Sequence, residues 1–207
     1  MVLSGGEPLL LNDDLLWRIL KGLRSVDSVK TLRVETRILS HLPQRVTESL
    51  VAALKDCGPV WFQAGVNHPE EITGEFAEAA AALADAGIPL LSETVLLKDI
   101  NDRPRVLADL FSSLHRLRIR PAQLIHCLPV PGGDHLRTSV SAGLRLMQVL
   151  RGGLPEPSLP EYAAETFGGR IPLRGESVLS RTPRRVLLRN SDGRIYVYPE
   201  KFFSFSA

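Results

Sequence analysis

The repeated alternation of short β-rich segments with amphipathic helices constrains the fold of this chain more than any other feature. Five apolar segments, the first of them "MVLSG", are each followed by a stretch with helical periodicity, at residues 13–23, 44–55, 69–86, 103–117 and 140–150. Alternation at this spacing is typical of parallel β/α units. An open doubly wound sheet and a β/α barrel both fit it, but the chain has neither a Gly-x-Gly-x-x-Gly nor a Walker motif. We therefore expect an α/β fold with the architecture of a partial β/α barrel.

The C-terminal ends of the expected strands are the places to look for a site, because ligand-binding residues of β/α barrels lie there. In this sequence the strand ends fall at residues 5–7, 35–37, 65–68, 93–97 and 126–129. His126 and His135 flank the loop that follows the fifth strand. No third ligand accompanies them at a metal spacing, so we expect no metal site from these histidines.

Residues 153–207 differ in character from residues 1–152, which form the expected barrel. A segment rich in Pro and Gly predicts an irregular crossing, and alternating apolar residues around Asp192 and Gly193 predict a β-hairpin. We expect both to belong to the same domain as the barrel. The last residues, 201–207, include three Phe and are a candidate for packing against the domain itself or against a partner chain, which leaves a homo-oligomer open.

The bulk composition excludes several classes of protein. The chain has 207 residues, of which 44% are hydrophobic and 23% charged, enough for one substantial core. No apolar run approaches a membrane span and no secretory signal is recognisable, so we expect no membrane partner. Cys57 and Cys127 lie far apart and form no ligand pattern, which favours a reduced, cytoplasmic setting.

The charge is unevenly distributed, although the net charge is only +2. Residues 1–102 carry 15 acidic and 9 basic side chains, whereas residues 103–207 carry 8 acidic and 16 basic ones. A basic half can attract a phosphate-bearing ligand or nucleic acid. The arginines are scattered rather than clustered with aromatic residues, so we do not expect nucleic acid as a partner.

The first strand ends in "SGGEP", where two glycines precede a carboxylate. Gly5 and Gly6 allow the backbone to approach a ligand closely, and Glu7 can hold an ammonium group by charge-assisted hydrogen bonds. The simpler interpretation is an ordinary strand-to-helix turn with a solvated Glu7.

Longer segments favour the first interpretation, because they resemble the lysine 2,3-aminomutase family of radical S-adenosylmethionine enzymes. The matching segments, in the order of the family, are "VLSGGEPLLL", "LRVETRILSHLPQRVT", "VNHPEEIT", "ADAGIPLLSETVLLKDIND", "RPAQLIHCLPVPGGDHLRT" and "FGGRIPL". The resemblance covers nearly the whole chain. It implies a β/α barrel without its first unit, which holds a 4Fe-4S cluster, S-adenosylmethionine and pyridoxal phosphate. In such enzymes a 5′-deoxyadenosyl radical takes a hydrogen from an amino acid substrate, and the amino group then migrates from C2 to C3.

The resemblance assigns cofactor-binding roles to the residues that match the motifs of the family: Ser4, Gly5, Gly6, Glu7, Arg37, His68 and Glu93. His68 has an equal alternative as the cap of the helix expected from Pro69. Glu93 replaces a glutamine that members usually carry near the cofactor, and this exchange removes the amide donors.

Three departures from the family bear on the chemistry. The Cys-x-x-x-Cys-x-x-Cys motif that holds the cluster is absent, so we expect a cluster only if a segment upstream of Met1 supplies the cysteines. Arg170 stands where the family has the lysine that forms the imine, which puts pyridoxal phosphate in doubt, although arginine can pair with a phosphate. Leu128 replaces an aspartate that binds the substrate's distant ammonium, and Glu165 lies near a second substrate-binding acid of the family.

Three hypotheses follow for the function. The favoured one is an incomplete chain of a radical aminomutase that acts on a small amino acid. A second is a non-catalytic relative that binds S-adenosylmethionine or a partner. A third is a β/α barrel lyase or aldolase that forms a Schiff base on Lys98, which we disfavour because Lys98 falls in a turn that the family shares.

Overall fold

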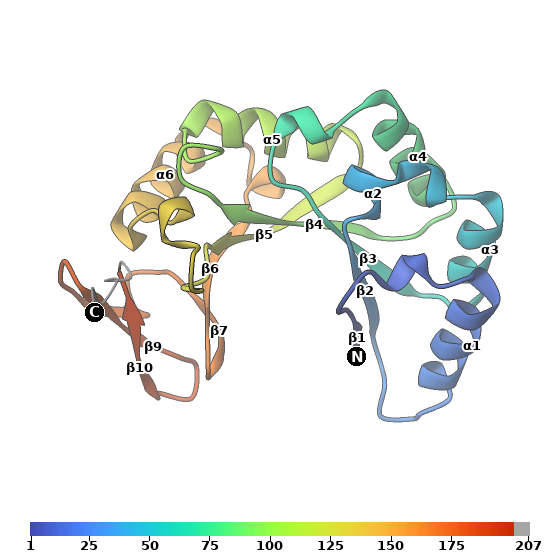
Figure 1. Ribbon diagram of the computed structural model, residues 1–207, viewed down its shortest axis with the longest axis horizontal. Coiled ribbons are helices and arrows are strands. Elements are labelled where there is room, and N and C mark those ends of the chain that lie inside the picture. Colours follow the sequence, from blue (N-terminus) through green and yellow to red (C-terminus); the bar gives the residue numbers. More distant parts are fainter. Residues whose placement is uncertain (201–207) are drawn as a thin grey trace. The chain divides into compact units, whose positions relative to one another are not determined.

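The structure is a computed structural model that describes residues 1–200 of the chain (Figure 1). The strands are β1 Val2–Leu3, β2 Leu32–Thr36, β3 Val60–Gly65, β4 Leu90–Leu96, β5 Ile119–His126, β6 Glu161–Thr166, β7 Gly169–Pro172, β8 Val178–Arg181, β9 Arg185–Arg189 and β10 Ile195–Pro199. The α-helices are α1 Asp13–Arg24, α2 Ile38–His41, α3 Glu48–Asp56, α4 Gly74–Asp85, α5 Pro104–Arg116 and α6 Val140–Gly153. Short 3-10 helices lie at Pro8–Leu10, Pro43–Arg45, Pro69–Glu71, Asp134–Leu136 and Glu156–Ser158.

The chain divides into two compact units. The first comprises Met1–Glu93 and Ser112–Pro121, and the second comprises Thr94–Phe111 together with the chain from Ala122 onward. Strands β1 to β7 hydrogen-bond in chain order, and β8 to β10 form a separate antiparallel sheet. The pairs β1–β2, β2–β3, β3–β4 and β5–β6 are parallel, as the alternation of strands and helices predicts.

The core of the first unit follows from the alternation along its strands. In β2 the side chains of Leu32, Val34 and Thr36 are buried, whereas Arg33 and Glu35 are half-exposed. Helix α1 begins where the sequence predicts it, with the Asn12 side chain accepting a hydrogen bond from the backbone N–H of Leu15 at 2.8 Å. This pattern places one face of the parallel sheet against helices and leaves polar side chains on the other.

Two expected helices are interrupted near their N-termini. The helix expected at 44–55 begins only at Glu48, because the Thr47 hydroxyl caps it through the backbone N–H of Leu50 at 3.2 Å. The helix expected at 69–86 is divided into a 3-10 turn and α4, which Thr73 caps through the N–H of Phe76. Gly74, a poor residue for a helix interior, is therefore the first residue of α4, where its low helix propensity costs little.

The second unit contains more regular structure after residue 153 than the sequence predicts. Strand β6 adds in parallel to β5, and β7 returns antiparallel to β6 with Glu165 opposite Arg170. The buried run Tyr162–Ala164 and Ile171 explain why the segment pairs rather than crossing irregularly. The expected hairpin is confirmed as β9 and β10, with Gly193 at a φ of 81° in the turn, and β8 pairs with β9.

Two further expectations concern membrane-spanning helices and the aromatic residues at the end of the chain. Among the described residues no helix is long and apolar enough to cross a membrane. The expectation for the aromatic residues 201–207 lies outside the described part of the chain.

Candidate functional site

The loop that follows β1 contains two glycines whose backbone conformation requires them. Gly5 has a φ of 91° and Gly6 a φ of 56°, a region that residues with a side chain rarely adopt. A Cβ atom at either position would meet nothing within 4 Å. Both glycines are exposed, so the backbone of this loop is open to a ligand.

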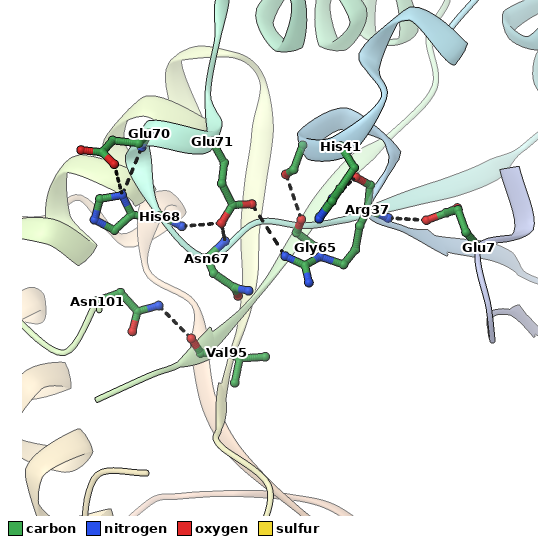
Figure 2. A network of polar contacts seen from close by, with 11 residues as sticks. Glu7, Arg37, His41, Gly65, Asn67, His68, Glu70, Glu71, Val95 and Asn101 are labelled. Carbon is green, nitrogen blue, oxygen red and sulfur yellow. Dashed lines mark hydrogen bonds and ion pairs between the residues drawn. The ribbon is translucent and has the colours of Figure 1, made fainter. Parts of the chain in front are cut away.

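Glu7 fixes this loop to the end of β2 (Figure 2). Its Oε1 atom accepts hydrogen bonds from the Thr36 hydroxyl at 2.5 Å and from the backbone N–H of Leu9 at 3.2 Å. Its Oε2 atom accepts one from the backbone N–H of Arg37 at 2.8 Å. The carboxylate is therefore not simply solvated, as the turn interpretation supposed. It holds the glycine loop in place, and the backbone of both glycines stays exposed.

Arg37 directly follows the last residue of β2, and its side chain lies across the end of β3. Its aliphatic stem passes so close to Gly65 that an added Cβ there would lie 3.0 Å from the Arg37 Cγ atom. The guanidinium Nη2 atom lies 3.9 Å from Glu71 Oε2, and the Arg37 side chain is 53% exposed. The Ser40 hydroxyl donates to the carbonyl of Gly65 at 3.2 Å and ties the following helix α2 to the same strand end. Arg37 thus presents a positive charge that one neighbouring carboxylate balances only in part.

His68 serves as a cap, which was one of its two interpretations. Its Nδ1 atom accepts a hydrogen bond from the backbone N–H of Glu70 at 3.3 Å. Glu71 Oε1 reciprocates by accepting from the N–H groups of Asn67 and His68 at 2.9 and 3.0 Å, a capping box on a 3-10 turn. Among the described residues His68 Nε2 has no hydrogen-bond partner, so capping does not exclude a contact with a ligand.

Glu93 is paired with a glutamine from the neighbouring strand. The Gln63 side-chain amide donates to Glu93 Oε2 at 2.8 Å, and Glu93 lies opposite Gly65 in the β3–β4 register. Gln63 is 3% exposed, and sequence reasoning did not select it. Gln63 therefore places a side-chain amide beside Glu93, whose carboxylate is its acceptor. A polar residue inside an apolar strand is the signal that could have identified Gln63.

The first unit thus brings several predicted residues together at the C-terminal ends of consecutive strands. Contacts run from Glu7 to Arg37 and from Arg37 to Glu71, and Glu71 in turn holds the backbone of His68 (Figure 2). Sequence reasoning missed Thr36, Gln63 and Glu71, which position the others. Ser4 is exposed beside the glycines.

The second unit holds the other predicted pair, Glu165 and Arg170. Arg170 Nε donates to Glu165 Oε1 at 2.6 Å, and Nη2 lies 2.5 Å from the same oxygen. Glu165 and Leu128 line one cavity of about 320 Å³, whose walls are mainly apolar and aromatic and include Phe167, Tyr196 and Tyr198. The acid at position 165 is therefore already paired with a cation.

The residues of this chain do not fit two of the cofactors that the resemblance implies. Cys57 and Cys127 are both buried and belong to different units, and the described residues contain no group of three or more potential metal ligands. Arg170 cannot form an imine with pyridoxal phosphate, and its guanidinium is bound to Glu165. His126 is a core residue: its Nδ1 atom lies 2.6 Å from the Tyr162 hydroxyl, and burial lowers its pKa to about 3.

Solved structures share the fold of this chain. A domain of a pyruvate-formate lyase-activating enzyme from Bacteroides vulgatus matches with a TM-score of 0.55 and 17% identity, covering 78% of this chain and 97% of that one. Streptococcus suis SuiB bound to S-adenosylmethionine matches with a TM-score of 0.60 and 13% identity, covering 80% of this chain and 39% of that one. At such identities the likeness concerns the fold alone, and it confirms the expected partial β/α barrel.

Relatives identified by sequence are closer. The L-lysine 2,3-aminomutase of Methanococcus maripaludis is 42% identical over 202 residues, covering 97% of this chain and 47% of that protein. The L-lysine 2,3-aminomutase of Fusobacterium nucleatum is 39% identical over 202 residues, covering 97% of this chain and 48% of that protein. The glutamate 2,3-aminomutase of Clostridioides difficile is 36% identical over 197 residues, covering 94% of this chain and 47% of that protein.

No family model matches the chain. The chain spans about half the length of the curated relatives it matches. Identity at this level over nearly all of the chain, together with the shared fold, confirms the resemblance of the motifs. Over nearly its whole length, the chain is a relative of the L-lysine and glutamate 2,3-aminomutases.

Proposed function

We propose that the first unit of this chain binds S-adenosylmethionine and that the chain is part of a radical aminomutase acting on a small amino acid. The observation that carries the proposal is the linked set Glu7, Arg37, Glu71 and His68 at the ends of consecutive parallel strands, beside an open glycine loop. Ligands of parallel β/α folds bind at this edge.

Three groups at this edge, the glycine loop, Arg37 and Glu93, have a chemical counterpart on S-adenosylmethionine. The open backbone carbonyls of the glycine loop would accept hydrogen bonds from the methionine ammonium group. The exposed guanidinium of Arg37 would pair with the methionine carboxylate, a charge-assisted contact. The acceptor at Glu93 suits hydroxyl groups of the ribose. When bound in a radical enzyme, S-adenosylmethionine supplies the 5′-deoxyadenosyl group that takes a hydrogen from the substrate.

The residues present limit what else this chain supplies. They do not provide the thiolates of a 4Fe-4S cluster or the amine of a pyridoxal phosphate imine, so we derive no step through either group. The amino acid substrate is proposed from the relatives, which act on lysine and on glutamate by their names. With Leu128 apolar and Glu165 already bound to Arg170, the 320 Å³ cavity favours a substrate side chain without a terminal ammonium group.

Titration calorimetry of the 207-residue chain with S-adenosylmethionine tests the proposal. We expect saturable binding that weakens about tenfold in Arg37→Met, which keeps the aliphatic stem over Gly65 but removes the charge. Arg105→Met, at a position where the side chain is 94% exposed, is the matched control and should bind like the parent chain. No binding by a folded chain, or equal loss in both variants, would contradict the proposal.

A non-catalytic relative that binds S-adenosylmethionine is the second candidate, because Arg170 replaces the imine lysine and is paired with Glu165. Release of 5′-deoxyadenosine by a longer protein containing this chain separates the two. Formation of this product together with a rearranged amino acid supports the aminomutase, whereas binding without any product supports the non-catalytic relative.

A further inference from the structure

The second unit contains a cavity of about 380 Å³ that has no part in the proposed function. It is formed by the loop after β4, the residues before α5 and the segment that leads from β5 into α6. The residues that line it are Lys98, Asp102, Asp134, Arg137, Thr138, Ser139 and Ala142. Its volume lies at the low end of the range for small-ligand sites.

Three polar atoms of the lining are buried without a hydrogen-bond partner among the described residues. They are Asp134 Oδ1, Arg137 Nη1 and Thr138 Oγ1. A buried polar group without a partner is destabilising, and native proteins contain few of them. One donor, one acceptor and one hydroxyl around a single cavity therefore indicate an occupant that hydrogen-bonds to all three.

Two backbone carbonyls hold the Arg137 side chain in place. This side chain is only 1% exposed, Nε donates to the carbonyl of Cys127 at 3.1 Å, and Nη2 donates to the carbonyl of Pro199 at 2.7 Å. The guanidinium also lies 5.7 Å from the ring centre of Tyr198. With Nε and Nη2 committed, Nη1 is the atom left to bind an occupant, and its position is fixed in advance.

The other polar groups at the start of α6 are already used. The Ser139 hydroxyl accepts a hydrogen bond from the backbone N–H of Ala142 at 3.1 Å, and Glu200 Oε2 accepts one from Val140 N–H at 3.1 Å. The helix N-terminus is thus capped by the protein itself. The unused hydrogen-bonding capacity of the cavity lies on the side chains of Asp134, Arg137 and Thr138. Lys98 and Asp102 belong to the same lining.

The charges of the lining select the chemistry of the occupant. Lys98 and Arg137 are cationic, whereas Asp102 and Asp134 are anionic, so a lone anion or a lone cation would meet two repelling groups. Arg137 Nη1 and Asp134 Oδ1 form an ion pair at 3.8 Å, a distance too long for a hydrogen bond between them. Adjacent opposite charges on a ligand can bind side by side to these two atoms.

We propose that this cavity binds a small zwitterion of the α-amino acid type, with the carboxylate on Arg137 and Thr138 and the ammonium group on Asp134. None of its lining residues belongs to the residues proposed for S-adenosylmethionine or to the Leu128–Glu165 cavity. The inference therefore stands independently of the proposed function. Water alone is the competing occupant, since a cavity of this size holds several molecules at about 30 Å³ each.

Nuclear magnetic resonance titration of the whole chain provides the test, with three probes that separate the charges. Glycine carries both charges, acetate carries only the carboxylate, and methylammonium carries only the cation. We expect saturable shifts of the backbone amide signals of Lys98, Thr138 and Ser139 with glycine, and at least about tenfold weaker binding of the two single-charge probes. Acetate binding as well as glycine, or no saturable shift with glycine, overturns the proposal, the second outcome indicating water alone.

Matched variants locate the site. Asp134→Asn and Thr138→Val keep the size of the side chain, and each should weaken glycine binding about tenfold while the spectrum remains that of a folded chain. Asp109→Asn, an exposed acid on α5, should leave glycine binding unchanged. Loss of binding in Glu165→Gln alone would assign the glycine signal to the Leu128–Glu165 cavity and overturn the proposal.

Discussion

At the scale of single residues, the hydrogen bonds of Glu7 explain why a carboxylate follows the glycines. Its two oxygens accept from three donors, one of them on β2 and one just after it. A carboxylate offers acceptors only, so it can satisfy all three without presenting a donor to any of them. Glu7 therefore anchors the glycine loop to the end of β2.

Glu7→Gln tests this role, because the amide places donors where an acceptor is needed. We expect the free energy of unfolding to fall by about 1–3 kcal/mol, since at least one of the three donors loses its partner. Urea unfolding followed by circular dichroism measures it. Glu78→Gln, an exposed position of α4, serves as the control and should change stability by less than about 0.5 kcal/mol.

A second residue-scale prediction concerns Gly143 in α6. A Cβ atom at this position would lie 1.9 Å from the Tyr162 hydroxyl oxygen, which itself lies 2.6 Å from His126 Nδ1. Gly143→Ala should therefore destabilise the chain by about 1–3 kcal/mol, as overpacking does. Gly22→Ala in α1, where the Cβ meets nothing within 4 Å, should instead stabilise it by about 0.5–1 kcal/mol. Equal effects of the two changes in thermal unfolding would contradict this interpretation.

At the scale of secondary-structure elements, caps decide where the helices begin. Thr47 and Thr73 interrupt stretches that the periodicity alone joins into longer helices. The turn at Pro69–Glu71 is capped by His68 on one side and by Glu71 on the other. Arg45, His68 and Glu71 lie in or next to the 3-10 turns that precede these helices. The positions of these side chains near the strand ends therefore depend on where each helix begins.

His68→Asn separates the cap from a ligand contact, because asparagine is a strong N-cap residue. We expect the melting temperature to change little. S-adenosylmethionine binding should weaken, since the Nε2 atom is lost. Calorimetry and thermal unfolding of the same variant give the two values. Unchanged binding with unchanged stability would leave His68 with capping as its whole role.

Arg45 links the end of the 3-10 turn after Glu7 to the start of α1. It donates to the carbonyls of Leu9 and Leu11 at 2.7 and 2.8 Å and lies 2.5 Å from Asp13 Oδ1. Burial acts to raise the pKa of Asp13, but hydrogen bonds from Ser49 and Arg45 and the charge of Arg45 lower it overall. The pair therefore stabilises the fold above the pKa of Asp13 in the unfolded chain and loses this effect as pH falls through the lower folded value.

At the scale of the whole molecule, the two units divide the proposed tasks. The first unit contains the residues proposed for S-adenosylmethionine, and the second contains the Leu128–Glu165 cavity and the proposed zwitterion cavity. The core of the second unit includes the buried imidazole of His126, which lies edge-on to Tyr162 and Tyr198. This neutral imidazole makes the stability of the molecule sensitive to acid.

The direction of that dependence follows from the pKa of His126, which burial and the charge of Arg137 lower from 6.5 to about 3. Between these values the unfolded chain binds a proton that the folded chain does not, so the free energy of unfolding falls as pH falls. We expect this one group to contribute up to about 1.4 kcal/mol per pH unit below about pH 6. His126→Gln should remove this contribution from urea unfolding measured at several pH values. An identical pH dependence in the parent and the variant would refute it.

The sequence predicts most of the architecture, because period-two and helical patterns are local. It also places the glycine loop and Arg37 at strand ends. It does not predict that Gln63 would reach Glu93 or that Arg170 would bind Glu165, because both contacts depend on the register between strands. The strands β6 and β7 escape prediction for a similar reason, since short segments rich in Pro and Gly pair only when a neighbouring strand offers an edge.

The close passage of Arg37 over Gly65 has a consequence for how such chains can vary. A side chain at position 65 would displace the arginine stem, because its Cβ would lie 3.0 Å from Cγ. Substitutions at these two positions are therefore epistatic: Gly65→Ala should weaken S-adenosylmethionine binding when Arg37 is present and have little further effect in Arg37→Ala. Across diverging members, a bulkier residue at position 65 should accompany a shorter one at position 37, so the two positions should change together rather than one at a time.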